Sequence, residues 1–203
     1  MINQGEFNSV LREKISNTIL YLTQGRETAF VKILKLLYLT DELAVKEEGA
    51  PITWLSYYAW KRGPVPVDVY NEVEAMVLNK EPISNETSLN LHKYFSTKQD
   101  DGTKIICPKS EVDIGKLSEN EIGLLNRILS LYGHMSAQEL VDITHDKDSL
   151  WLKVVEQNKL DEYFKLNGDR SNYPVDFISL IDTEYKKSIY TESLDSLRFN
   201  KYF

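Results

Sequence analysis

Two histidines and an aspartate near the middle of the chain are the residues best suited to hold a metal ion. Asp142 and His145 are three positions apart, a spacing that puts both side chains on one side of a helix, where they could ligate one ion. A continuous helix would put His134 about 16 Å from His145, too far for a shared ion, and Gly133 and Ser136 indicate that the two do not share a helix. We therefore expect no metal site, and we expect His145 to end a helix or to hydrogen-bond within the core.

Other patterns of catalytic residues are missing from the sequence. It has no Gly-x-Ser-x-Gly nucleophile turn, no phosphate-binding Walker loop and no Gly-x-Gly-x-x-Gly motif. Cys107 precedes a proline on an expected strand, a poor place for an activated thiolate. Acidic pairs at positions 47–48 and 100–101 fall at expected helix ends and turns, where solvated carboxylates are poor general acids. We expect no catalytic residues and no cofactor, and the alternative is a metal-dependent enzyme that uses Asp142 and His145.

Aromatic and cationic residues between positions 54 and 70 are better suited to binding another protein. Lys61 and Arg62 follow a run of large aromatic side chains and precede a Gly-Pro-Val-Pro turn. Gly63 can turn sharply, and Pro64 and Pro66 fix the backbone at alternate residues, so the turn should be rigid. Exposed aromatic and arginine side chains on a rigid turn bind well because little entropy is lost on binding. The predicted contact residues are Trp54, Tyr57, Tyr58, Trp60, Arg62 and Tyr70. The alternative is a corner that is only structural.

Helices must position this turn. Apolar residues at helical spacing predict a first helix over residues 7–22, beginning at Phe7 and ended by Gly25. Thr28 is the expected N-cap of a second helix over residues 29–48. Because its apolar residues occupy much of its circumference, this second helix should be central to the core.

The segment around the turn is harder to assign. Residues 53–60 are rich in strand formers, but Thr53 could cap a helix, and we favour a short helix. Pro66 is well placed to open a helix over the residues that follow, because proline suits the first helical turn.

A β-hairpin is predicted later in the chain. Residues 93–97 and 103–107 have strand character and flank an Asp-Asp-Gly turn at 100–102. Pro108 would close the second strand and indicates a sheet edge. A lone hairpin is only marginally stable, so it should pack on the helices. The predicted fold is mainly α, of the α+β class: a compact multi-helix domain with one small antiparallel β-hairpin.

Two capping boxes mark further helices. Ser118 with Glu121, and Ser136 with Glu139, each place a Ser three residues before a Glu. Gly133 should end the first of these helices. Two helices joined by a short turn resemble DNA-binding geometry, but the second helix offers acidic side chains, which phosphate repels.

Composition narrows the possible partners. The 203-residue chain has a formal net charge of −7, which disfavours nucleic acid and suits a basic protein. No apolar run is long enough to span a bilayer, and the first six residues do not resemble a secretory signal. A single cysteine cannot form an internal disulfide. We therefore expect a cytoplasmic protein with no membrane partner.

Two blocks of the sequence resemble the SocA-like Panacea domain. The first comprises Lys35-Leu36-Leu37-Tyr38-Leu39-Thr40-Asp41, Pro51-Ile52-Thr53 and the turn at Gly63, Pro64 and Pro66. The second comprises Leu117 to Ile122, Tyr132, Gly133, Ser136, Ala137, Leu140, Thr144, His145 and Trp151. The resemblance runs from about Phe30 to Trp151. Two blocks in the same order are far more specific than either alone.

This resemblance carries expectations about function. Members of the family occur as phage-associated proteins and as antitoxins of bacterial toxin–antitoxin pairs, which implies a cognate toxin as partner and neutralisation by direct contact. The alternatives are a phage-associated DNA-binding regulator and a proteolytic adaptor that delivers its toxin to a protease. We expect residues 1–165 to form the domain. Residues 166–203 should form a C-terminal extension, helical and docked on it.

Overall fold

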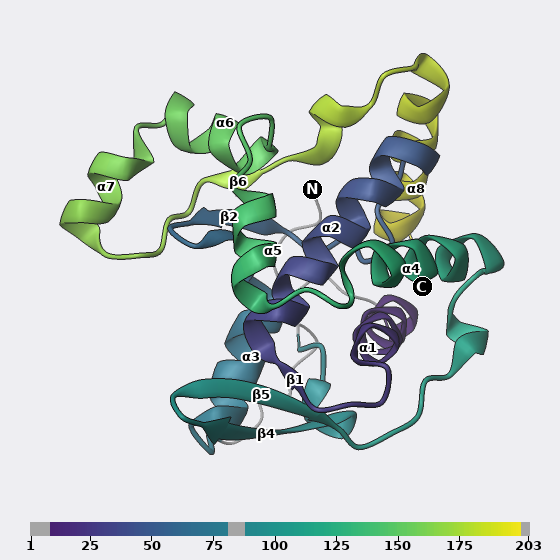
Figure 1. Cartoon of the computed structure of the whole chain (residues 1–203). Coiled ribbons are helices and arrows are strands. Elements are labelled where there is room, and N and C mark those ends of the chain that lie inside the picture. The colour runs from purple at the N-terminus through teal and green to yellow at the C-terminus, as the bar shows by residue number, and fades with distance from the viewer. Residues whose placement is uncertain (1–8, 81–87, 200–203) are drawn as a thin grey trace.

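The computed structural model describes residues 9–80 and 88–199, with backbone only at 198 and 199 (Figure 1). Within these ranges the helices are α1 (Ser9–Thr23), α2 (Phe30–Glu48), α3 (Val67–Val77), α4 (Glu119–Tyr132), α5 (Ala137–Thr144), α6 (Leu150–Gln157), α7 (Leu160–Asn167) and α8 (Glu184–Phe199). The strands are β1 (Thr28–Ala29), β2 (Tyr57–Trp60), β3 (Gly63–Pro66), β4 (Phe95–Asp100), β5 (Thr103–Pro108) and β6 (Pro174–Val175). The predicted mainly α fold with some β structure is confirmed.

Helix α2 runs through the middle of the molecule, with α1, α4 and α5 packed against it (Figure 1). Its buried side chains, Ile33, Leu36 and Leu37 among them, lie on several sides of the helix, as the sequence predicted. Gly49 ends the helix with φ of +83°, a left-handed conformation that glycine adopts without strain. The core therefore forms around α2, and every other part of the fold is placed relative to it.

The prediction of one hairpin was incomplete, because the strands form two small antiparallel sheets. One has the order β1-β5-β4 and the other has the order β3-β2-β6. The predicted hairpin is β4–β5, but β5 is the central strand, so the expectation that Pro108 marks an edge was wrong. Strand β1 pairs only with Ile105 and Ile106, and Pro108 lies beyond that pairing. Its missing N–H therefore costs no hydrogen bond to β1.

Two local predictions near α2 were wrong. Residues 57–60 form strand β2 rather than a helix: Tyr57 and Ala59 are buried while Tyr58 and Trp60 are half-buried, the alternation of a strand between core and surface. Thr28 does not cap α2, because it lies in β1 and the N-cap position is Ala29, without a side-chain bond. The predicted first residue of the N-terminal helix, Phe7, lies outside the described residues.

Several predictions about where helices begin and end are confirmed. Pro66 is the N-cap of α3. Both capping boxes form, with Ser118 and Ser136 each accepting a hydrogen bond from the backbone N–H three residues on. Gly133 follows the last residue of α4, and His145 is the C-cap of α5. These are short-range features that depend on neighbouring residues alone.

The C-terminal residues contact the rest of the chain in several places. Strand β6 pairs with β2, and Tyr190 of α8 packs on Trp54 with ring centroids 5.1 Å apart. Lys186 Nζ donates to the Lys46 carbonyl oxygen at 2.6 Å, so a cation binds the C-terminal end of α2, where the helix dipole favours positive charge. The domain boundary after residue 165 stays a prediction.

Candidate protein-interaction surface

The turn that the sequence singled out is the tip of the β2–β3 hairpin. Tyr57 pairs with Pro66 and Trp60 pairs with Gly63, so Lys61 and Arg62 connect the two strands. Gly63 has φ of +99°, which residues with a Cβ rarely adopt. The sharp turn predicted at this glycine is thus present, and it lies within a hairpin.

A buried lysine lies beneath this tip. Lys35 of α2 is 1% exposed, and its Nζ donates to the Pro64 carbonyl oxygen at 2.9 Å. A Cβ on Gly63 would lie 2.6 Å from Lys35 Nζ and 2.9 Å from the hydroxyl oxygen of Thr144. Burial, followed by the nearby charge of Arg62, lowers the pKa of Lys35 to about 7. Because Gly63 has no side chain, Lys35 of α2 and Thr144 of α5 can both pack closely against the turn.

The second sequence block reaches the same tip from α5 and α6. Trp151 Nε1 donates to the Trp60 carbonyl oxygen at 2.8 Å, and the His145 ring stacks on Trp151 with centroids 3.8 Å apart. Burial, followed by the charge of Lys35, lowers the pKa of His145 to about 4. Its Nε2 is buried and has no hydrogen-bond partner among residues 9–80 and 88–199. His145 is thus a neutral packing residue at ordinary pH, as well as the end of α5.

The loop before β6 holds the hairpin from a third side. The Lys61 N–H donates to the Asp169 carbonyl oxygen at 2.9 Å, and the Ala59 N–H donates to the Tyr173 carbonyl oxygen at 2.9 Å. Ser171 Oγ also donates to the carbonyl oxygen of Ala59. Together with Lys35 and Trp151, these bonds fix the tip to α2, α6 and the loop.

Aromatic rings and two arginines lie at this end of the hairpin, and we call Tyr58, Trp60, Arg62, Tyr70 and Arg170 the hairpin-tip surface. Trp60 and Tyr70 meet edge to face at 4.7 Å. The Arg170 guanidinium carbon lies 4.8 Å from the Trp60 centroid and 5.0 Å from the Tyr70 centroid, within the range of cation–π attraction. Arg62 is exposed and donates to Gln138 Oε1 at 3.4 Å. Four of the predicted contact residues therefore lie on the β2–β3 hairpin and the helix that follows it, and two of them, Trp60 and Tyr70, are in contact.

The other two predicted contact residues are buried rather than exposed. Trp54 is 9% exposed and packs on Tyr190, and Tyr57 is 1% exposed with its hydroxyl bonded to Asp41. Both are core residues in this structure, so neither offers a surface to a partner. The sequence could not show this, because the residues that cover Trp54 come from α8.

Asp41 is the centre of a second buried polar group. Its Oδ1 accepts from the backbone N–H groups of Ile52 and Thr53, each at 2.9 Å, and its Oδ2 accepts from the hydroxyls of Thr53 and Tyr57. Burial raises the pKa of Asp41 to about 6 against the opposing effect of these hydrogen bonds. The carboxylate joins α2 to the segment that leads into β2, and so fixes where the hairpin begins.

The residues proposed for a metal are engaged in other ways. Asp142 Oδ1 accepts from Gln138 Nε2 at 2.9 Å, and His145 stacks on Trp151. In the part of the chain that the structure describes, no three His, Cys, Asp or Glu side chains are grouped as a metal ion requires. The described helices also include none long and apolar enough to cross a bilayer.

Three of the residues that build this region were missed as site residues. Lys35 and Asp41 occur in the first sequence block, where their spacing on a predicted helix indicates nothing about burial. Arg170 lies in a stretch that reads only as a polar loop. The sequence signal that could have identified Lys35 and Asp41 was a charged residue within an otherwise apolar helical pattern. No sequence signal pointed to Arg170.

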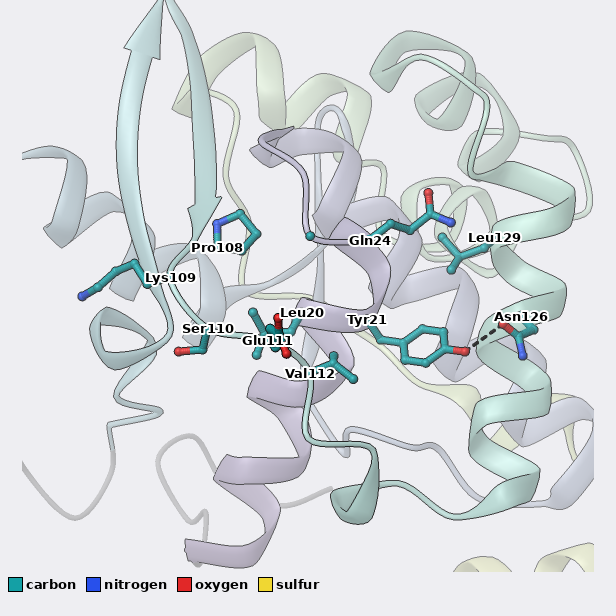
Figure 2. Close-up of a pocket in the computed structure, with 11 residues that line it drawn as sticks. Leu20, Tyr21, Gln24, Pro108, Lys109, Ser110, Glu111, Val112, Asn126 and Leu129 are labelled. Carbon is teal, nitrogen blue, oxygen red and sulfur yellow. Dashed lines mark hydrogen bonds between the residues drawn. The ribbon is translucent and has the colours of Figure 1, made fainter.

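An open cleft of about 640 Å³ lies elsewhere, between α1, α4 and the chain that leaves β5 (Figure 2). Tyr21 of α1 donates its hydroxyl hydrogen to Asn126 Oδ1 of α4 at 2.8 Å, across one side of the cleft. The residues that line it include none from the hairpin-tip surface. The two features are therefore separate.

The model of the antitoxin SocA-like, Panacea domain family matches residues 33–152, which is more than half of the chain. The protein belongs to this family. The matched range contains Lys35, Asp41, the β2–β3 hairpin, His145 and Trp151, so the Panacea domain is the part in which these residues meet. Arg170, β6 and α8 lie beyond it. No curated protein and no solved structure matches the chain. Membership of the family supports an antitoxin role in general.

Proposed function

We propose that this Panacea-domain protein neutralises a toxin encoded by a neighbouring gene, and that it binds the toxin directly through the hairpin-tip surface. The antitoxin role follows from the family. The choice of surface rests on one observation: the hairpin tip accepts hydrogen bonds from Lys35 and Trp151 and donates one to the Asp169 carbonyl oxygen of the loop. A tip held in this way loses little entropy on binding, and it carries the residue types that dominate protein interfaces.

A DNA-binding regulator fits the surface less well. The helix next to Arg62 is α5, and its solvent-facing residues include Gln138, Glu139 and Asp142. The two carboxylates of this helix would repel a phosphate backbone, and the chain as a whole carries a net charge of −7. A protein partner has no such uniform charge and can be accommodated.

Co-expression with the neighbouring gene tests the proposal. Wild-type protein should restore growth to cells that express the toxin, and the double variant Trp60→Ala, Arg62→Ala should restore much less. Arg127→Ala and Tyr185→Ala are matched controls, because both residues are exposed and lie on other elements. Circular dichroism and thermal unfolding must show that the double variant is folded.

The possible results test the antitoxin role and the contact surface separately. If the wild-type protein gives no rescue, the antitoxin role is wrong for this gene pair. If a folded double variant rescues as well as the wild type, the contact lies elsewhere on the protein. An immunoblot of the toxin tests the adaptor alternative, because inhibition by binding leaves the toxin abundant and delivery to a protease depletes it.

A further inference from the structure

The two arginines of the hairpin-tip surface have no acidic partner among residues 9–80 and 88–199. The hydrogen bond of Arg62 is to the neutral amide of Gln138, and Arg170 Nη2 donates to the Tyr70 hydroxyl at 3.0 Å. Elsewhere in the protein, exposed cations do find carboxylates: Arg127 Nη2 donates to Glu47 Oε1 at 2.7 Å. Arg62 and Arg170 therefore have guanidinium donors that remain available to a partner.

Nearby carboxylates are bonded to other groups. Asp142 accepts from Gln138, and Asp169 pairs with Lys61 at 3.1 Å. Glu74 accepts from the Tyr70 hydroxyl at 2.9 Å and pairs with Lys104. None of these three acids is bonded to either arginine, although each contacts a neighbour of one of them.

Basic side chains lie at the tip and beneath it, and burial holds the lower ones largely uncharged. Besides Arg62, two basic side chains lie directly beneath it, Lys35 and His145, and both are disfavoured in their charged forms by burial first and by neighbouring cations second. The charge of Asp142 has the opposite effect, because it raises the pKa of His145. A carboxylate placed against Arg62 would offset this local repulsion, although the chain as a whole is acidic.

We infer that the hairpin-tip surface binds carboxylate side chains of the partner protein, with Arg62 and Arg170 as two separate anchors. The inference rests on the proposed function and specifies the chemistry of the toxin's contact residues. A planar guanidinium donates two parallel hydrogen bonds to a carboxylate, and the Arg170 guanidinium already lies against the rings of Trp60 and Tyr70. A single carboxylate carries one negative charge, so the acidic surroundings repel it less than they repel a chain of phosphates.

Charge reversal tests the inference on the purified proteins. The dissociation constant for the protein of the neighbouring gene should rise at least about tenfold in Arg62→Glu and in Arg170→Glu, the scale of a lost charge-assisted contact. The dissociation constant of Arg62→Lys should lie between those of the wild type and Arg62→Glu, because lysine keeps the positive charge but cannot donate two parallel hydrogen bonds. Arg127→Glu is the matched control, and it should bind like the wild type. A Glu→Arg or Asp→Arg change in the toxin that restores binding to Arg62→Glu would identify the carboxylate.

A second measurement does not need the toxin. Nitrogen-15 NMR of the arginine side chains should show shifts of Arg62 and Arg170 on addition of a hexaglutamate peptide, and none on addition of a hexaglutamine peptide. If a twelve-residue oligothymidylate shifts them more strongly than hexaglutamate, the preferred ligand is nucleic acid and the inference is overturned. If both Glu variants keep wild-type affinity while wild-type protein still neutralises the toxin, the inference fails and the proposed function stands. Failure of the wild type to neutralise defeats the proposed function instead.

Discussion

Lys35 and Pro64 are joined by a hydrogen bond inside the protein, from the lysine Nζ to the proline carbonyl oxygen at 2.9 Å. The bond ties the central helix α2 to strand β3 at Pro64, two residues after Arg62 at the hairpin tip. A lysine in such a place is costly when charged, because burial removes water that would solvate the ammonium group. The same contact that orders the hairpin tip therefore makes the stability of the protein depend on pH.

Stability should rise with pH above neutrality, and Lys35 should be responsible for part of that rise. The pKa of Lys35 is about 7 in the folded protein against an ordinary value of 10.5. Between these values the unfolded chain holds a proton that the folded protein lacks, so raising the pH favours folding. Urea unfolding at pH 7.5 and pH 9.5 should show an increase of about 2 kcal/mol from this residue.

Lys35→Met provides the comparison, because it keeps a long side chain and removes the titrating group. The variant should lack the increment that Lys35 supplies, so its unfolding free energy should change less between the two pH values. Equal pH dependence in the two proteins would mean that Lys35 keeps its proton in the folded state throughout this range.

Replacing Gly63 by alanine should destabilise the protein strongly. The backbone has φ of +99°, and the added Cβ would lie 2.6 Å from Lys35 Nζ. Strain and overlap together should cost about 3 kcal/mol or more, measured by urea unfolding. Gly25→Ala separates the two effects: φ is +68° there but nothing lies within 4 Å, so the cost should be about 1 kcal/mol. Similar losses at both positions would show that the contact with Lys35 is unimportant.

The sequence predicted what depends on neighbouring residues and failed where distant segments decide. The capping boxes at Ser118 and Ser136 and the apolar pattern of α2 are local, and they were recognised. Residues 57–60 became a strand because they pair with β3 and with β6, more than a hundred residues later. The strand formers of this segment were a local signal, but no local pattern could report the pairing with β6.

The same reasoning applies to the candidate surface. Arg62, Trp60 and Tyr70 were predicted as a group because they lie close together in sequence. Whether an aromatic residue of that group is exposed was decided by distant contacts: Trp54 is covered by Tyr190 of α8. Arg170 joins the surface because its loop packs against β2, a contact that composition does not encode.

Removing the Asp41 carboxylate should be among the most damaging single changes. In Asp41→Ala, four hydrogen-bond donors of Ile52, Thr53 and Tyr57 lose their acceptor inside the protein. The expected loss in the free energy of unfolding is about 3–5 kcal/mol. Tyr57→Phe removes one of these bonds and should cost about 1 kcal/mol. As a control, Asp148→Ala at an exposed position should stay within about 0.5 kcal/mol of the wild type; a comparably small effect at Asp41 would contradict the role given to this carboxylate.

Contacts of α8 predict that residues 166–203 contribute to the stability of the whole protein. Tyr190 is 8% exposed and packs on Trp54, while Tyr185 on the same helix is 75% exposed. Tyr190→Ala should lower the free energy of unfolding by about 2–4 kcal/mol and preserve one cooperative transition, whereas Tyr185→Ala should change it by less than about 0.5 kcal/mol. Thermal unfolding followed by tryptophan fluorescence and by circular dichroism measures both quantities. If the two variants lose the same small amount, or if α8 melts in a separate earlier transition, the C-terminal extension is not docked as an integral part of the domain.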